Sequence, residues 1–151
     1  MVKTKESIVY YGAVGRRKSA VARVRLYIAS KSKEVAVGDI KMKQGDIFIN
    51  KKQALQIFPS SADTSYYLRP LVLTDTKERF AISIHVRGGG KRGQLDAISH
   101  GLARAIEKID PSIYRAALKA EGLLTRDPRV RERRKVGTGG KARRRKQSPK
   151  R

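Results

Sequence analysis

Hydrophobic and polar residues alternate over residues 20–28, and this alternation predicts a half-buried strand. The even-numbered positions are all apolar and end on Ile28, whereas Arg23, Arg25 and Tyr27 lie on the opposite face. The segment therefore predicts one face packed on a core and one basic face open to solvent.

A second alternating segment, Arg79–Arg87, predicts the best-defined strand of the chain. Its apolar face runs from Phe80 to Val86. Between the two strands, Lys31–Gly45 is polar and is expected to form a loop or an irregular hairpin, and Asp46–Asn50 is expected to form a short strand. The opposite face of the Arg79–Arg87 strand is polar and carries Arg79, Ser83, His85 and Arg87.

Helical spacing replaces alternation in the second half of the chain. Residues 60–69 predict a short helix that ends before Pro70, because a proline disfavours helical conformation in the residue before it. Apolar residues at spacings of three and four then predict an amphipathic helix over Gln94–Ile109. These apolar residues are Leu95, Ile98, Leu102, Ile106 and Ile109.

Two Asp-Pro pairs suggest further helix starts, with Asp as N-cap and Pro in the first turn. Asp110-Pro111 predicts a helix, and Asp127-Pro128 predicts one or two more turns before Gly137. The inward face of the helix after Pro111 is expected to consist of Ile113, Ala117, Ala120 and Leu124.

This order of elements predicts an α+β fold in which helices cover one face of a mixed sheet. We expect residues 1–125 to form one globular domain. Residues 126–151, here called the tail, contain too few apolar side chains to fold alone and are expected to be extended and disordered when free. The uncovered sheet face or the loops would be left for a partner.

Charge identifies the kind of partner. The chain contains 36 Lys and Arg against 13 Asp and Glu, and the tail alone contains 13 against 2. Residues 1–125 therefore keep 23 basic residues against 11 acidic ones, so domain and tail are both basic. A basic folded surface together with a basic arm is typical of a nucleic-acid-binding protein.

The segment Gly88-Gly89-Gly90-Lys91-Arg92-Gly93 fits the pattern G-x-G-x-x-G, but its context excludes a dinucleotide site. Instead of a second parallel strand that ends in an acidic residue, another helix follows. Glycines beside Lys91 and Arg92 at a helix start still favour phosphate contact. Gly15-Arg16-Arg17-Lys18-Ser19, continued by Arg23 and Arg25, is a second basic patch suited to nucleic-acid backbone.

Catalysis, metals and membranes have no support in the residues. The chain has no Cys, and its two histidines, His85 and His100, have no neighbouring nucleophile or carboxylate cluster in sequence. We expect no enzyme activity, no cofactor, no metal and no small-molecule substrate. No segment is long and apolar enough to predict a membrane span or a targeting signal.

Three segments together resemble the ribosomal protein nine family of the small subunit, in its bacterial form. They are Gly15–Val24, Val86–Gly90 with Gln94–Arg104, and Arg126–Arg151. The resemblance implies a domain like the second domain of ribosomal protein S-five, with a left-handed βαβ crossover. It also implies a place in the head of the small subunit of a cytoplasmic ribosome, among neighbouring head proteins.

The resemblance further implies that the tail passes through ribosomal RNA and that Lys150 and Arg151 contact the anticodon stem-loop of the peptidyl-site tRNA. The chain departs from the family at Gln147–Arg151, which lacks the usual aromatic residue and contains Pro149. Ile28–Gly45 is also longer than usual. The residues expected to bind ribosomal RNA are Arg16, Arg17, Lys18, Arg23, Arg25, Arg87, Lys91, Arg92, Arg126, Arg129, Arg131, Arg133, Arg134, Lys135, Lys141, Arg143, Arg144, Arg145 and Lys146.

Two other classes of protein remain as alternatives. A free-standing RNA chaperone or RNA-processing subunit would use the same tail on many RNAs and would have no stable place in a large particle. A DNA-compacting protein is less favoured, because the basic arm shows no apolar wedge and the chain shows no dimerising heptad.

Overall fold

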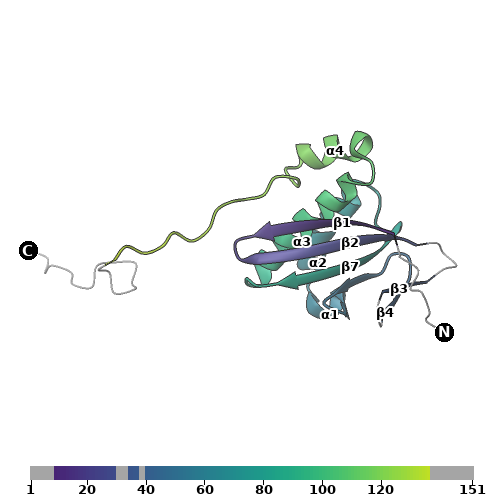
Figure 1. Cartoon of the computed structure of the whole chain (residues 1–151), viewed down its shortest axis with the longest axis horizontal. Helices are drawn as coiled ribbons and strands as arrows, with labels where there is room; N and C mark the ends of the chain where they lie inside the picture. Colours follow the sequence, from purple (N-terminus) through teal and green to yellow (C-terminus); the bar gives the residue numbers. More distant parts are fainter. Residues whose placement is uncertain (1–8, 30–33, 38–39, 137–151) are drawn as a thin grey trace, which may run out of the picture.

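A five-stranded mixed sheet lies at the centre of the molecule in the computed structural model, which describes residues 9–29, 34–37 and 40–136. The strand order is β1-β2-β7-β5-β6 (Figure 1). All neighbouring strands are antiparallel except β5 and β7, which are parallel. The strands are β1 (Tyr10–Arg17), β2 (Ala20–Ile28), β5 (Ile47–Ile49), β6 (Lys52–Gln53) and β7 (Phe80–Arg87).

Helices cover one face of this sheet, so the predicted α+β architecture with a mixed sheet is confirmed. α1 (Ala54–Ile57) and α2 (Ser61–Leu73) lie between β5 and β7 in the chain, and α3 (Lys91–Glu107) and α4 (Pro111–Ala120) follow β7. The predicted apolar stripe of α3 is buried from Leu95 to Ile106 and packs on β1 and β2, whereas Ile109 follows the end of the helix and is partly buried. Asp110 caps α4 as predicted, since its carboxylate accepts from the backbone N–H groups of Ser112 and Ile113.

Among the residues that the structure describes, the opposite face of the sheet is covered only at one end. β3 (Val35–Val37) and β4 (Ile40–Met42) form a small antiparallel ribbon there, and a second apolar cluster contains Tyr27, Met42 and Ala81. Two predictions for β2 are wrong. Tyr27 packs in the cluster under this ribbon and is 3% exposed, although the alternation placed it on the open face. Ile28 was predicted to be inward, but it lies at the strand end and is 64% exposed.

Two helix boundaries differ from prediction. α2 does not stop before Pro70 but continues to Leu73, with Pro70 buried inside it. The buried side chain of Leu71 holds this last turn on the core and offsets the hydrogen bond that Pro70 cannot make. α3 begins at Lys91 rather than Gln94, and therefore includes Gly93 from the glycine-rich segment.

The predicted inner face of α4 is wrong, and of its four residues only Leu124, which lies beyond the helix, packs against the core. Ile113 is 65% exposed and Ala117 and Ala120 are exposed, whereas Leu118 is fully buried and Tyr114 packs beside it. Tyr114 and Leu118 are four residues apart and so share one stripe of the helix. The sequence of α4 contains two apolar stripes, and packing against α2 and α3 buries the stripe with Tyr114 and Leu118.

Two further segments also differ from expectation. Residues 10–17, for which no strand was predicted, form the edge strand β1 and pair with β2 along their whole length. The helical turns predicted after Asp127-Pro128 are wrong, because residues 126–135 contain neither helix nor strand. Val130 is 64% exposed, and without an apolar face to bury, so short a helix is unstable.

Candidate nucleic-acid interface

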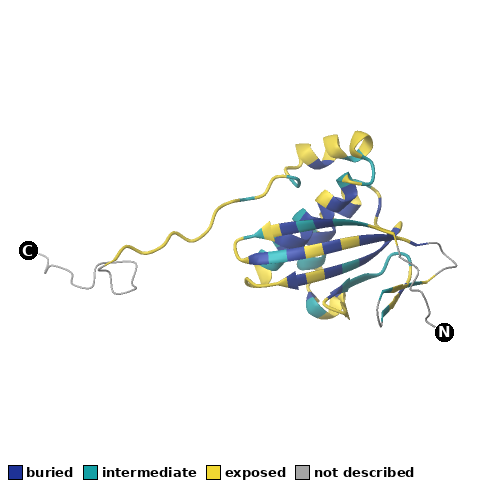
Figure 2. Cartoon of the chain, in the orientation of Figure 1, coloured by how far each residue is buried: buried dark blue, intermediate teal, exposed yellow. Residues whose placement is uncertain are grey.

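Buried and exposed positions alternate along β2 (Figure 2), and this alternation turns its basic side chains away from the helices, towards the open sheet face. On β2, Arg23 lies between Val14 and His85 in the register, and Arg25 lies between Gly12 and Ser83. Arg25 also stacks on Tyr10, with its guanidinium carbon 5.0 Å from the ring centre. Within the described residues, Arg23, Arg25 and Arg87 form no ion pair, so their charge is available to an anion.

The glycine-rich loop and the turn between β1 and β2 lie together at one end of this face. Gly88 and Gly89 have φ values of 71° and 67°, a conformation that favours glycine. A Cβ on Gly88 would lie 2.6 Å from the Ser19 carbonyl oxygen. This close approach brings the two basic motifs, around Lys18 and Arg87, into one region, which the sequence did not predict.

Lys91 and Arg92 lie in the first turn of α3, but each also has an acidic neighbour. The Lys91 ammonium is 2.7 Å from Asp63, and the Arg92 guanidinium is 3.6 Å from Asp96 and stacks at 4.0 Å over the Tyr66 ring. Gly90 caps the helix without a side chain. Lys91 and Arg92 remain more than half exposed, so both can still reach an external anion.

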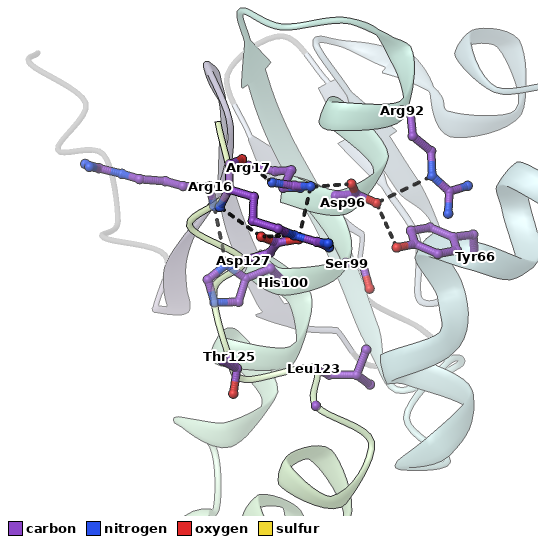
Figure 3. A pocket seen from close by; sticks show the side chains of 12 residues that line it. Arg16, Arg17, Tyr66, Arg92, Asp96, Ser99, His100, Leu123, Thr125 and Asp127 are labelled. Carbon is purple, nitrogen blue, oxygen red and sulfur yellow. Dashed lines mark hydrogen bonds and ion pairs between the residues drawn. The ribbon is translucent and has the colours of Figure 1, made fainter. Parts of the chain in front are cut away.

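A polar pocket of about 280 Å³ lies beside this helix start and contains Arg17, Tyr66, Asp96 and Asp127 (Figure 3). Asp96 accepts a 2.7 Å hydrogen bond from Tyr66 and pairs with Arg17 at 3.4 Å. Burial, followed by the bond to Asp96, raises the pKa of Tyr66. No sequence signal showed that Asp96 connects α3 with α2 and β1.

The start of the tail is attached to the same pocket. Asp127 lies 3.0 Å from the Arg17 guanidinium, and its carboxylate accepts from both the backbone and the side chain of Arg129. These hydrogen bonds from Arg129 hold the pKa of Asp127 well below its usual range. Arg126 and residues 128–136 are exposed. The other predicted tail residues, Lys141, Arg143, Arg144, Arg145, Lys146, Lys150 and Arg151, lie outside the described residues.

Side chains of α3 and of its C-cap residue Lys108 form hydrogen bonds with the backbone on the outer edge of β1. The Arg16 backbone N–H donates to Nδ1 of His100, Arg104 donates to the Val14 carbonyl, and Lys108 donates to the Gly12 carbonyl. The three side chains are spaced four residues apart along the helix, and the three strand residues are spaced two apart. Four helical residues rise by about 6.0 Å and two strand residues by about 6.6 Å. The matching rises allow one helix face to cover a strand edge that would otherwise be open to pairing.

We expect His100 to make the stability of the protein depend on pH. Burial lowers its pKa, and Arg104 and Arg126 also disfavour the charged form. Because the folded-state pKa lies below the unfolded value of about 6.5, the stabilisation is complete above that pH and is lost as pH falls through the folded-state value. The midpoint of urea unfolding should fall between about pH 7 and pH 5, and His100→Gln should reduce this fall. An equal fall in both proteins would contradict the assignment.

A small α+β domain with an open basic sheet face and a basic terminal extension is a nucleic-acid-binding protein in its general features. Among the described residues, no helix is long and apolar enough to cross a membrane, and no cluster of three or more His, Asp or Glu residues is arranged to hold a metal.

Comparison with known families gives a specific result. Residues 15–151 match the family described as ribosomal protein S9/S16, and the chain belongs to that family. It is therefore an RNA-binding structural protein of the small ribosomal subunit that functions in translation and associates with ribosomal RNA and other ribosomal components. The family is structural rather than enzymatic.

Proposed function

We propose that this chain sits in the head of the small subunit of a cytoplasmic ribosome, among neighbouring head proteins. In this proposal the open face and the tail bind ribosomal RNA, while Lys150 and Arg151 reach the anticodon stem-loop of the peptidyl-site tRNA. The observation that carries it is the path of residues 130–136, which are exposed and run away from the domain (Figure 1). A basic segment held at one end and exposed beyond it is suited to follow RNA.

The fold supports a likeness to the second domain of ribosomal protein S-five. β5 and β7 are parallel neighbours with α1 and α2 between them in the chain. A parallel pair requires such a crossover, and we propose that it has the left hand that the family resemblance implies. The pattern of sheet pairing and of helix cover on one face agrees with this proposal.

Electrostatics supplies the binding mechanism. Each guanidinium can bridge two phosphate oxygens, and each neutralised phosphate releases a counterion that contributes roughly 0.7–0.9 to the salt slope. Among the described residues, the open-face arginines Arg23, Arg25 and Arg87 have no paired carboxylate to give up on binding. The proposed surface consists of Arg16, Lys18, Arg23, Arg25, Arg87, Lys91 and Arg92 on the domain, and of the basic residues from Arg126 onward in the tail.

Deletion of Lys150 and Arg151 tests the tRNA contact. Loss of two charged donors should weaken peptidyl-site tRNA binding by about a hundredfold or more, since bonds to charged groups contribute about 1.5–3 kcal/mol each. Reconstituted small subunits should still form, because the domain and most of the tail are intact. The measurement is tRNA binding to these subunits.

A matched control exchanges the two residues, as Lys150→Arg with Arg151→Lys, and thereby keeps both charges. This control should bind tRNA nearly as tightly as the natural chain. If the deletion binds tRNA with unchanged affinity, the tRNA contact is wrong, whereas subunits that fail to form would instead show that the two residues contribute to assembly.

A further inference from the structure

Arg16 and Arg17 are adjacent in sequence but occupy opposite sides of β1. Strand alternation places the Arg17 side chain on the helix side, where its exposed fraction is 14%, whereas Arg16 is exposed. Sequence reasoning placed both in one RNA-binding patch. Their environments differ enough to separate their roles.

Every nitrogen of the Arg17 guanidinium already lies near a protein oxygen, two of them in ion pairs and one in a hydrogen bond. Nε lies 3.4 Å from Asp96, one terminal nitrogen lies 3.0 Å from Asp127, and the other donates to the Arg129 carbonyl at 2.6 Å. Asp96 belongs to α3, and the other two acceptors belong to the start of the tail. Arg17 therefore connects the sheet and a helix to the segment that precedes the exposed part of the tail.

The segment that Arg17 holds is itself restrained. Asp127 binds both the backbone and the guanidinium of Arg129, and Pro128 between them has a fixed φ. Three successive residues are thus fixed to the domain at the point where the chain leaves it. These contacts lie directly before residues 130–136, which are exposed.

We propose that Arg17 is the positioning residue of the tail and not an RNA ligand. Its contacts with Asp127 and Arg129, here called the tail clamp, aim the basic tail before RNA arrives. Such pre-organisation reduces the ordering that binding must supply. The advantage for RNA binding rests on the proposed function of the tail, whereas the clamp itself is a property of the free protein.

The first test measures the direction of the tail in the full-length free protein. The chain has no Cys, so spin labels can be placed at Val72→Cys on α2 and Val130→Cys in the tail, both at exposed positions. Electron-electron double resonance should give a narrow distance distribution, and Arg17→Gln should at least double its width. Arg23→Gln, which removes an equal charge from the open face, should leave the width unchanged.

Two more variants keep this test decisive. Arg17→Lys keeps the charge but should broaden the distribution, since one ammonium on a flexible stem cannot meet three separate acceptors. Asp127→Asn breaks the tail side of the clamp without altering the domain, and should broaden it as well. Equal widths in the natural chain, Arg17→Gln and Asp127→Asn would overturn the clamp.

The second test separates positioning from phosphate contact. Arg17→Gln should weaken binding to small-subunit ribosomal RNA several-fold with an unchanged salt slope, whereas Arg23→Gln should lower the slope by roughly 0.7–0.9. An equal loss of slope in both variants would overturn the proposal and make Arg17 an RNA ligand. If removing the tail leaves RNA affinity unchanged, the proposed function fails, while the distance measurement still decides the clamp.

Discussion

Deletion of residues 131–151 should lower the affinity for small-subunit ribosomal RNA by about a thousandfold near physiological salt, and should reduce its salt dependence. The deleted segment contains eleven Lys and Arg and one Glu. If each cation neutralises one phosphate, the slope of log affinity against log salt falls by about 8–10. Titration of the RNA between about 50 and 200 mM salt measures both effects.

The deletion point follows from the structure. Ending the chain at Val130 keeps Asp127 and the Arg129 carbonyl, so the tail clamp remains intact. Residues 131–136 are exposed, and their loss should not change the midpoint of unfolding.

A double variant of the open face, Arg23→Gln with Arg25→Gln, serves as the control for charge loss elsewhere. It should reduce the slope by only about 2, because it removes two cations. If the deletion reduced the slope no more than this control, the tail would not be the main contact with phosphate.

The elements that the sequence predicted well are those with a single strong periodicity. β2, β7 and α3 each place one apolar stripe on one core, so local pattern and tertiary packing agree. β1 was missed because Gly12, Gly15 and its two terminal arginines interrupt the alternation, and pairing with β2 stabilises it instead. Tyr27 and the inner face of α4 depend on which distant segment packs on them, and no local pattern contains that information.

The candidate site was also predictable only in part. Charge and glycine patterns identified the basic motifs, and the structure brings the turn at Lys18 close to Arg87. The tail clamp was not predictable, because Arg17, Asp96 and Asp127 are far apart in sequence and each has an ordinary local setting. A sequence shows that an arginine is present, but only the fold shows whether that arginine already forms an ion pair with a carboxylate.

Gly15→Ala should destabilise the protein by more than about 3 kcal/mol, a large part of the stability of a domain of this size. A Cβ on Gly15 would lie 1.9 Å from the Ala97 carbonyl oxygen and 2.8 Å from the Cα of Gly101. Both are backbone atoms of α3, so the clash can be relieved only by moving the helix away from β1. That movement would also separate His100, Arg104 and Lys108 from the strand edge.

Gly93→Ala adds the same methyl group at a position that has room for it. Its added Cβ would meet only ordinary contacts at 3.8 Å, and the position lies in the first turn of α3. Alanine is a better helix former, so this variant should be neutral or more stable by up to about 1 kcal/mol. The measurement is the free energy of unfolding of both variants in urea. If Gly15→Ala is no less stable than Gly93→Ala, the close packing of α3 on β1 does not contribute to the stability of the fold.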